Sequence, residues 1–549
     1  MRLPRVFGRP AGHAARTPMS TPNATPADPA TAVEHVDVLF VGAGLSGIGA
    51  ARHLQMGHPD RTFLLLEGRE RSGGTWDLFR YPGIRSDSDL STFAYDFKPW
   101  TGAKAIADGE DILAYLREAA SETGVDQHIR YDHRVQHASF STADARWTVR
   151  VLHAGEELEL TCSWLFCASG YYRYDQGFSP TFAGAEDFAG QIIHPQLWPE
   201  DFDPEGKEIV VVGSGATAVT LVPALAKQGA HVTMLQRSPS YVLPLPSTDP
   251  IGDRFRTWFG DVRGHKLTRQ KNIEQQRILY AFCQRFPGRA RKWIRSINKK
   301  YLPEHVDVDV HFNPTYDPWD QRLCAVPHGD LFRAFQKRTA DIVTDGIERF
   351  TEKGVLTTSG TEIPADVIVT ATGLNLLLFG NMTLDVDGEP VDVPSTLAYK
   401  GFMGSGVPNF SFAIGYTNSS WTLKIDLVCR YLNRVLAHMD EHDFAIAVPV
   451  NDTPGMATKP LLDFKAGYVM RSLDQMPKQG ADAPWQLAMS YREDEKHLRK
   501  GAVSDGVLRF ARRGGSLPVS FAAGPIASTT AGTPAPTGAA APADAQVAA

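Results

Sequence analysis

The sequence lacks the features of several large protein classes. It has five cysteines in 549 residues, and no two of them form a C-x-x-C pair. We therefore expect neither a metal site nor a disulfide framework, and a reducing, cytoplasmic compartment fits best. No apolar run approaches the roughly 18 residues that span a bilayer. The net charge of -6 gives the chain as a whole no attraction to nucleic acid, so a nucleic-acid partner is not expected.

Acidic residues are also scarce near the two ends. No acid precedes Asp28, and residues 20–34 are mostly Pro, Ala and Thr. Early arginines faintly resemble a transit peptide, but the apolar core of a secretory signal is missing, and Met19 favours an upstream start or an extension. Residues 514–549 carry a single charge, Asp544. We expect both 1–34 and 514–549 to be disordered.

A glycine-rich loop follows the short apolar run at residues 36–41. It reads Gly42-Ala-Gly44-Leu-Ser-Gly47 and opens a helical pattern. Glycines at this spacing serve a tight turn, close approach of backbone to a pyrophosphate, and close packing of helix on strand. The next apolar run ends in Glu67, an acid that can accept hydrogen bonds from ribose hydroxyls. The pattern predicts a Rossmann-like dinucleotide site, and its position early in the chain suits FAD.

A second loop of the same kind follows residues 208–212. It reads Gly213-Ser214-Gly215-Ala-Thr217-Ala218, and alanine is accepted at the third glycine position. The following strand ends in Arg237 rather than in an acid. A guanidinium matches a 2'-phosphate in charge and in fork geometry, so this site suits NADPH. The alternative is that Arg237 is only a solvated charge at a strand end.

Two small-residue turns, 168–170 and 371–373, end buried apolar runs with the pattern A-[ST]-G. Such turns resemble the crossings between the nucleotide domains of two-dinucleotide flavoproteins. We therefore predict an α/β fold with two Rossmann-like dinucleotide-binding domains, one inserted in the other, plus a helical insertion. The expected division gives 35–170 and 374–513 to the FAD domain, 171–240 and 320–373 to the NADP-binding domain, and 241–319 to the helical insertion.

The helical insertion is basic. Residues 253–304 contain fourteen Lys and Arg against four Asp and Glu. Ile278, Leu279, Phe282 and Phe286 form one apolar stripe at helical spacing, which predicts packing against the parent domain. The alternative is that this basic amphipathic segment makes a peripheral contact with an anionic membrane.

Two further patterns lie between the two glycine-rich loops. Between the loops stands F-x-G-x-x-x-H-x-x-x-W-P, with Phe188, Gly190, His194 and Trp198. After the first loop stands G-x-W-x-x-x-x-Y-P-G-x-x-x-D, with Gly74, Thr75, Trp76 and Asp87. The structural alternative for the first pattern is an interdomain crossing that only buries aromatic rings. The alternative for the second is a helix cap formed by Ser86, Asp87 or Ser88 before Leu90. Both patterns resemble the fingerprints of the Baeyer-Villiger monooxygenases, class B flavoprotein monooxygenases, and are similar to the ethionamide-activating type.

The resemblance implies the chemistry and its residues. FAD reduced by NADPH would form a flavin C4a-peroxide with O2, which inserts one oxygen atom into a ketone to give an ester or lactone. Sulfides are further candidate substrates, because ethionamide activation oxygenates sulfur. Arg322 would face the flavin and stabilise the peroxide anion, and Asp87 would hold this arginine. Gln321 stands where many members have Lys. A purely structural Arg322, paired with Asp317 or Asp320, is the alternative.

Three other classes are less consistent with these residues. Flavin N- or S-monooxygenases use a similar linker that ends without the Trp198-Pro199 pair. A flavin disulfide reductase needs a redox-active cysteine pair just after the first loop, and none is there. A non-catalytic NADPH- and FAD-binding protein leaves Arg322 and Asp87 unexplained. The particular ketone or sulfide and the oligomeric state do not follow from the sequence.

Overall fold

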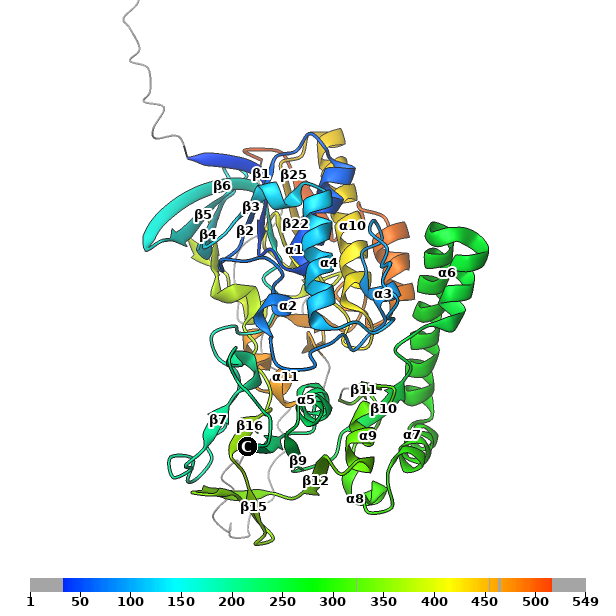
Figure 1. Ribbon diagram of the computed structural model, residues 1–549. Helices are drawn as coiled ribbons and strands as arrows, with labels where there is room; N and C mark the ends of the chain where they lie inside the picture. The colour runs from blue at the N-terminus through cyan, green and yellow to red at the C-terminus, as the bar shows by residue number, and fades with distance from the viewer. Residues whose placement is uncertain (1–32, 322, 454, 463–465, 516–549) are drawn as a thin grey trace, which may run out of the picture.

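The computed structural model describes residues 33–515 except 322, 454 and 463–465. The expected disorder of residues 1–32 and 516–549 lies outside the described residues. Figure 1 shows two sheet-and-helix bodies, one above the other, with a pair of long helices standing beside both. Among the described residues, no helix combines the length and apolarity needed to cross a bilayer.

The upper body is built on a nine-stranded sheet. At its centre β1 (Glu34–Val41) lies between β2 (Phe63–Leu66) and β6 (Glu156–Cys167), parallel to both. The remaining strands are β3 (Ile129–Arg130), β4 (Arg134–Ser141), β5 (Arg146–His153), β17 (Thr383–Val386), β18 (Glu389–Pro390) and β21 (Phe410–Phe412). One face packs on α1 (Leu45–Gly57), α4 (Gly109–Glu122) and α10 (Trp421–His442), whose apolar residues share one core with β1 (Figure 1).

The lower body contains a five-stranded parallel sheet in the order β12-β9-β8-β16-β7. Its strands are β7 (Gln191–Ile193), β8 (Glu208–Val212), β9 (His231–Gln236), β12 (Ala340–Thr344) and β16 (Val367–Thr370), and α5 (Ala216–Lys227) and α9 (Asp330–Gln336) pack on it. These strands fall between two stretches of chain that both supply the upper sheet. The predicted fold class, with one nucleotide-binding unit inserted in the other, is confirmed, while the exact domain boundaries stay a prediction.

The two chain crossings between the bodies lie side by side. Arg173 N donates to Asn375 O at 2.9 Å, and Leu377 N donates to Tyr171 O at 2.9 Å. Tyr172 and Leu376 form an antiparallel bridge between these bonds. The outgoing and returning segments are therefore one paired ribbon.

The helical insertion is helical as predicted, but its buried face is not the predicted one. It begins with β10 (Tyr241–Leu245), which pairs with β11 (Leu323–Pro327), and contains α6 (Pro250–Arg285), α7 (Pro287–Tyr301) and α8 (Val308–His311). Ile278 is 60% exposed and Phe286 43% exposed, so these two members of the expected stripe do not pack on the parent domain, while Leu279 and Phe282 are half-buried. Instead Arg269 docks α6, donating to the carbonyls of Ser91, Thr92 and Ala94 and to Asp426. The helix is held by polar contacts that hydrophobic periodicity does not report.

Shorter elements complete the chain. They are α2 (Thr75–Leu78), α3 (Leu90–Phe93), α11 (Gly467–Met470), α12 (Tyr491–Asp494), β13 (Ile347–Thr351), β14 (Gly354–Thr357), β15 (Glu362–Pro364), β19 (Ala398–Tyr399), β20 (Met403–Gly404), β22 (Ile446–Pro449), β23 (Thr458–Pro460), β24 (Lys478–Gly480) and β25 (Leu508–Ala511). The pair β22 and β25 lies against the end of α10.

Candidate active site between two dinucleotide loops

Both glycine-rich loops open into one continuous cavity of about 2160 Å³. This exceeds the ~300–1,000 Å³ of a typical site for one drug-sized ligand. Of the predicted site residues, the lining includes Gly42, Gly44, Glu67, Gly74, Thr75, Trp76, Asp87, Gly213, Ser214, Gly215, Thr217 and Arg237. The structure therefore brings the two predicted cofactor sites together in one space.

The first loop needs its glycines for different reasons. Gly42 has φ 105°, and a Cβ there would lie 2.8 Å from the carbonyl oxygen of Ala168. A Cβ on Gly47 would lie 1.9 Å from Gly42 O, so Gly47 serves the packing of α1 rather than lining the cavity. Gly44 faces Gly74, whose Cα would lie 3.4 Å from an added Cβ. The backbones of the two segments therefore approach each other closely at the amino end of α1.

Glu67 directly follows β2, lies beside the first loop and is 7% exposed. Its Oε2 accepts a hydrogen bond from Ala43 N at 2.9 Å. Burial raises the pKa of Glu67, and the bonds from the backbone of Ala43 and Arg69 oppose that rise. A carboxylate fixed to the loop in this way is suited to accept from a ligand hydroxyl.

The second loop repeats the arrangement. Gly213 has φ 137°, and its added Cβ would lie 2.5 Å from Ala371 O. Each loop therefore turns against one of the two A-[ST]-G turns. An added Cβ on Gly215 would meet nothing within 4 Å, so the backbone there is open to the cavity at the amino end of α5. Arg237 follows β9 and is exposed at the cavity wall.

The signature between Gly74 and Asp87 joins the two bodies. A Cβ on Gly83 would lie 2.7 Å from Ala224 Cβ on α5, and Tyr81 packs into the core of the lower body. Burial raises the pKa of Tyr81 to about 12. Arg85 Nη1 lies 2.6 Å from Asp330 Oδ2 on α9. The sequence analysis did not predict that this segment joins the two bodies, although Tyr81 and Gly83 are part of the signature itself.

Asp87 is an exposed residue of the cavity lining. It does not cap the following helix. The cap of α3 is Asp89, whose Oδ1 accepts from Thr92 N at 3.0 Å. The capping alternative for Ser86, Asp87 and Ser88 is therefore wrong, because Asp89 is the residue directly before Leu90, where α3 begins.

The linker fingerprint lies along the lower sheet. Its middle is β7, which pairs with β16. Phe188 is buried against β8 residues including Val210, and an added Cβ on Gly190 would lie 2.2 Å from Asp366 O. Trp198 packs edge-on against Phe202 at 5.3 Å between ring centroids. The linker does bury its aromatic rings, as the packing alternative expected, and it also forms the edge strand of the sheet.

His194 connects this edge strand to the returning crossing. Its Nδ1 accepts from Gln196 N at 3.2 Å, and its Nε2 lies 3.1 Å from Gly373 O. Burial lowers the pKa of His194, which favours the neutral ring. A neutral ring that accepts at Nδ1 carries its proton at Nε2 and donates it to Gly373 O. The histidine thus ties the linker to the second A-[ST]-G turn.

Arg322 lies outside the described residues, so its role stays a prediction. Its neighbours Gln321 and Leu323 both line the cavity. Sequence reasoning missed another cation there, Arg471, which lies 3.4 Å from the centroid of the Phe178 ring and donates to Leu374 O at 3.3 Å. Burial lowers the pKa of Arg471. No motif surrounds Arg471, so no signal in the sequence could have found it.

Cys162 and Cys167 have four residues between them, a spacing that the sequence interpretation passed over. Both are free, buried residues of β6, and burial raises the pKa of each thiol. Redox-active cysteines are accessible and have depressed pKa values. This pair is therefore part of the core rather than a disulfide-reductase centre.

Comparison with known proteins places the chain in a family. A model described as pyridine nucleotide-disulphide oxidoreductase matches residues 36–256, which include both loops. FAD-containing monooxygenase EthA of Mycobacterium tuberculosis is 53% identical over 481 residues, 87% of this chain and 98% of that protein. The chain belongs to this family of FAD-containing monooxygenases. The putative FAD-containing monooxygenase MymA of the same organism is 48% identical over 485 residues, 87% of this monooxygenase and 98% of MymA.

Solved structures share the fold of this monooxygenase. Oxidised steroid monooxygenase bound to NADP has a TM-score of 0.69 at 22% identity, covering 87% of this chain and 100% of that one. Cyclohexanone monooxygenase from Rhodococcus sp. Phi1 bound to NADP+ has a TM-score of 0.64 at 20% identity, covering 77% and 87%. The prediction of a flavoprotein monooxygenase with two dinucleotide-binding units is confirmed.

Proposed function

We propose that this monooxygenase is an NADPH- and FAD-dependent Baeyer-Villiger enzyme that converts ketones to esters or lactones and also oxygenates sulfides. The observation that carries the proposal is the shared cavity, into which both dinucleotide loops and Asp87 open. Both fingerprint patterns are complete in the sequence, including the Trp198-Pro199 pair. The names of the relatives support a flavin-dependent oxygenation.

The first loop fits FAD. Gly42 and Gly44 let the backbone approach a pyrophosphate, and the amino end of α1 favours its negative charge. The Glu67 carboxylate, held by Ala43 N, accepts from ribose hydroxyls. Gly74 lies close to Gly44, and Thr75 and Trp76 beside it line the same cavity.

The second loop fits NADPH. The open backbone at Gly215, with Ser214 and Thr217 beside it, receives the pyrophosphate at the amino end of α5. Arg237 contacts the 2'-phosphate through its guanidinium. His194 and the strand β7 hold the adjoining turn at Gly373, so the cavity keeps its shape on this side.

Bound FAD supplies hydride acceptance and oxygen activation, chemistry that amino-acid side chains lack. The protein supplies charge and shelter from water. Arg322, protonated at every working pH, stabilises negative charge that develops on the reacting oxygen atoms. Asp87 orients this arginine and offsets its charge. Arg471 is a further cation in the cavity wall.

Isotope labelling tests the function. Purified protein with FAD, NADPH and a panel of ketones under 18O2 is expected to give esters that carry one 18O atom. Oxygenation of amines or sulfides without any ester would favour the flavin N- or S-monooxygenase. NADPH consumption that yields only hydrogen peroxide across ketones and sulfides would refute the proposal.

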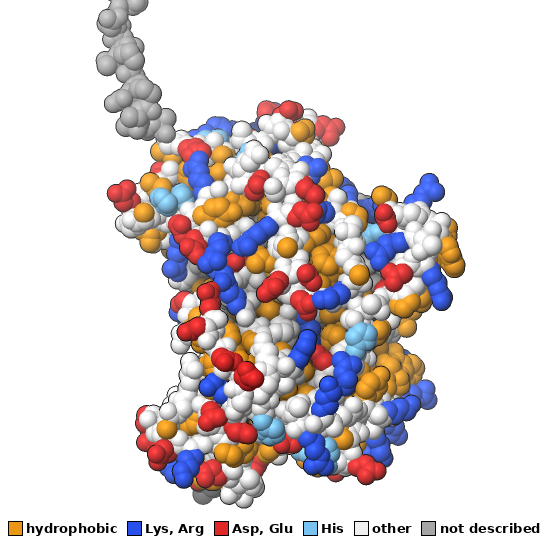
Figure 2. All heavy atoms as spheres, in the orientation of Figure 1, with side chains coloured by type: hydrophobic (Ala, Val, Ile, Leu, Met, Phe, Trp, Pro, Cys, Tyr) orange, Lys and Arg blue, Asp and Glu red, His pale blue; other side chains and the backbone are white. Residues whose placement is uncertain are grey.

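We further propose that the helical insertion makes a peripheral contact with the anionic, cytoplasmic face of a membrane. The helix α6 breaks at Gly260, where φ is 75°. Around this break Trp258 is 67%, Phe259 50% and Val262 63% exposed. Figure 2 shows hydrophobic and basic side chains together along the edge where α6 and α7 stand. Exposed aromatic rings among cations match the interface of an anionic bilayer.

Vesicle sedimentation tests this contact. We expect the protein to sediment with anionic phospholipid vesicles, less so with zwitterionic ones, and less so at high salt because screening weakens the attraction. The double variant Trp258→Ser, Phe259→Ser is expected to lose binding. Met56→Ser removes another exposed apolar side chain, 50% exposed and on α1, and is expected to keep it. Equal binding by both variants would contradict the proposal.

A further inference from the structure

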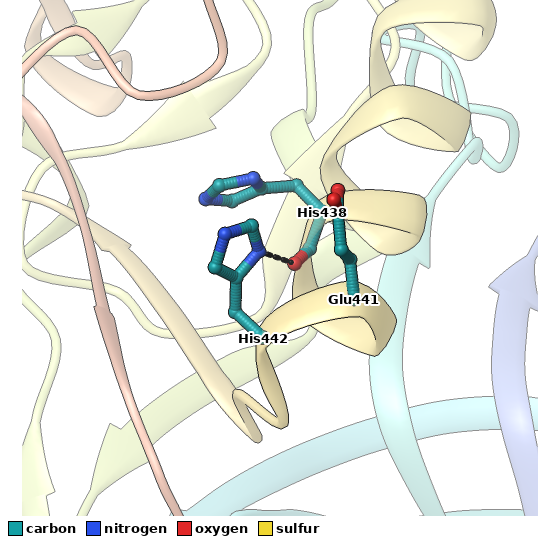
Figure 3. A group of neighbouring side chains, drawn as sticks. All are labelled: His438, Glu441 and His442. Carbon is teal, nitrogen blue, oxygen red and sulfur yellow. Dashed lines mark hydrogen bonds between the residues drawn. The ribbon is translucent and has the colours of Figure 1, made fainter.

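The last turn of α10 carries three side chains with metal-binding atoms. His438, Glu441 and His442 stand at positions i, i+3 and i+4, which places them on one face of a helix. One ligand atom from each lies within 4.8 Å of the others. Figure 3 shows the two imidazole rings one above the other, with the Glu441 carboxylate beside them. The cluster is far along the chain from both dinucleotide loops, and none of its residues lines the cavity.

We propose that His438, Glu441 and His442 bind one divalent transition-metal ion, of the Zn²⁺, Ni²⁺ or Cu²⁺ type. Two imidazoles and one carboxylate suit these ions, whereas Ca²⁺ and Mg²⁺ prefer sets of oxygen ligands. Glu441 and His442 are exposed and His438 is half-buried, so water completes the coordination. A cation is also favoured here by the helix macrodipole, because α10 ends at His442.

Aromatic packing holds both imidazoles before any ion binds. His438 lies edge-on to Phe510 of β25 at 4.8 Å between centroids. His442 lies parallel to Phe444, with 7° between the planes and 5.6 Å between the centroids. Phe444 in turn stacks on Phe510 at 5.3 Å. Side chains held in this way lose less conformational entropy when they bind a ligand.

The hydrogen bond made by the His442 ring is also consistent with metal binding. Its Nδ1 lies 3.0 Å from the carbonyl oxygen of His438, the contact drawn in Figure 3. When Nδ1–H donates to this carbonyl, Nε2 is unprotonated. Metal-binding histidines commonly donate their other ring N–H to a carbonyl or carboxylate, which orients the ring and raises its basicity.

The neighbouring acidic residues pair with arginines outside the cluster, so the three ligands remain available to a metal ion. Asp440 is engaged by Arg61, and Asp443 lies 3.9 Å from Arg512. The second cluster of this kind within the described ranges is His53, Asp96 and Asp426, and there arginines already take the place of an ion. Arg269 lies 2.7 Å from Asp426, and Arg430 pairs with Asp96. The exposed cluster on α10 is therefore the better candidate.

The bound ion would stabilise the junction between α10 and the β22–β25 pair. A ligand that binds only the folded state raises the free energy of unfolding by an amount that grows with the logarithm of its concentration over its dissociation constant. The site is open to solvent and distant from the cavity lining, so its role is structural rather than catalytic.

The test measures Zn²⁺ binding to the full-length, FAD-loaded chain without a histidine tag, by competition with a chromophoric chelator. We expect one Zn²⁺ per chain above any weaker background, with a rise in melting temperature. His438→Ala and His442→Ala are each expected to weaken binding by about tenfold or more and to remove the rise in melting temperature. Glu441→Gln is expected to weaken binding less, because both imidazoles remain.

The matched control is His305→Ala, which removes an exposed histidine of the helical insertion and is expected to leave Zn²⁺ affinity unchanged. Retained flavin absorbance and an unchanged melting temperature without Zn²⁺ show that each variant is folded. The proposal is overturned if the wild-type chain binds no Zn²⁺, or if His438→Ala and His442→Ala bind it as tightly as His305→Ala does.

Discussion

Arg322→Ala is expected to lower ester formation by about 100-fold, or about 3 kcal/mol, the usual effect of removing one preorganised donor to a developing oxyanion. Reduction of FAD by NADPH should persist, because Glu67, Arg237 and both glycine loops are unchanged. The variant should therefore consume NADPH and release hydrogen peroxide. Stopped-flow absorbance of the flavin and chromatography of the ester measure the two half-reactions separately.

Arg333→Ala is the control for this prediction. Arg333 is an exposed arginine on α9 that donates to the backbone of His328. Its loss should leave both half-reactions at wild-type rates. Arg322→Lys keeps the charge but loses the planar fork of donors, and we expect an intermediate rate. Ester formation by Arg322→Ala at the wild-type rate would remove this residue from the mechanism.

Arg237→Ala is expected to raise the KM for NADPH by about 10- to 100-fold, which corresponds to the loss of about 1.5–3 kcal/mol from hydrogen bonds to a charged group. The KM for NADH should change little, because NADH lacks the 2'-phosphate. Steady-state kinetics with both nucleotides and one ketone measure the ratio of the two effects.

Arg349→Ala provides the comparison, since Arg349 is an exposed arginine on β13, in the same inserted part of the chain. It should leave both KM values unchanged. If Arg237→Ala raises the two KM values equally, Arg237 does not recognise the phosphate, and the alternative of a solvated strand-end charge is correct.

The sequence was sufficient for the parts of this molecule that follow local rules. The strand before each loop, the glycines and the residue that follows the next strand all lie within about 30 residues of one another. Gly42 and Gly213 have positive φ angles that few other residues adopt, so the turns they form can be predicted from the sequence alone. For the same reason Glu67 and Arg237 could be assigned to different nucleotides before their surroundings were known.

The parts that failed depend on contacts between distant segments. Hydrophobic periodicity predicted that Ile278 and Phe286 would be buried, but α6 is docked by Arg269 on carbonyls almost 180 residues earlier in the chain. Arg471 reaches the cavity from a segment without any motif. The capping alternative failed for a local reason, because Asp89 directly precedes Leu90 and its side chain accepts from Thr92 N.

The paired ribbon formed by residues 171–173 and 375–377 limits how the two halves of the enzyme can move. Two unpaired crossings would allow the halves to separate. The hydrogen bonds between the paired crossings resist separation and still permit twisting. The fingerprint strand β7 belongs to the inserted sheet, so it must travel with that half. Because Tyr81 and the Arg85–Asp330 pair also join the two halves, the two nucleotide loops should keep a fixed spacing across the cavity.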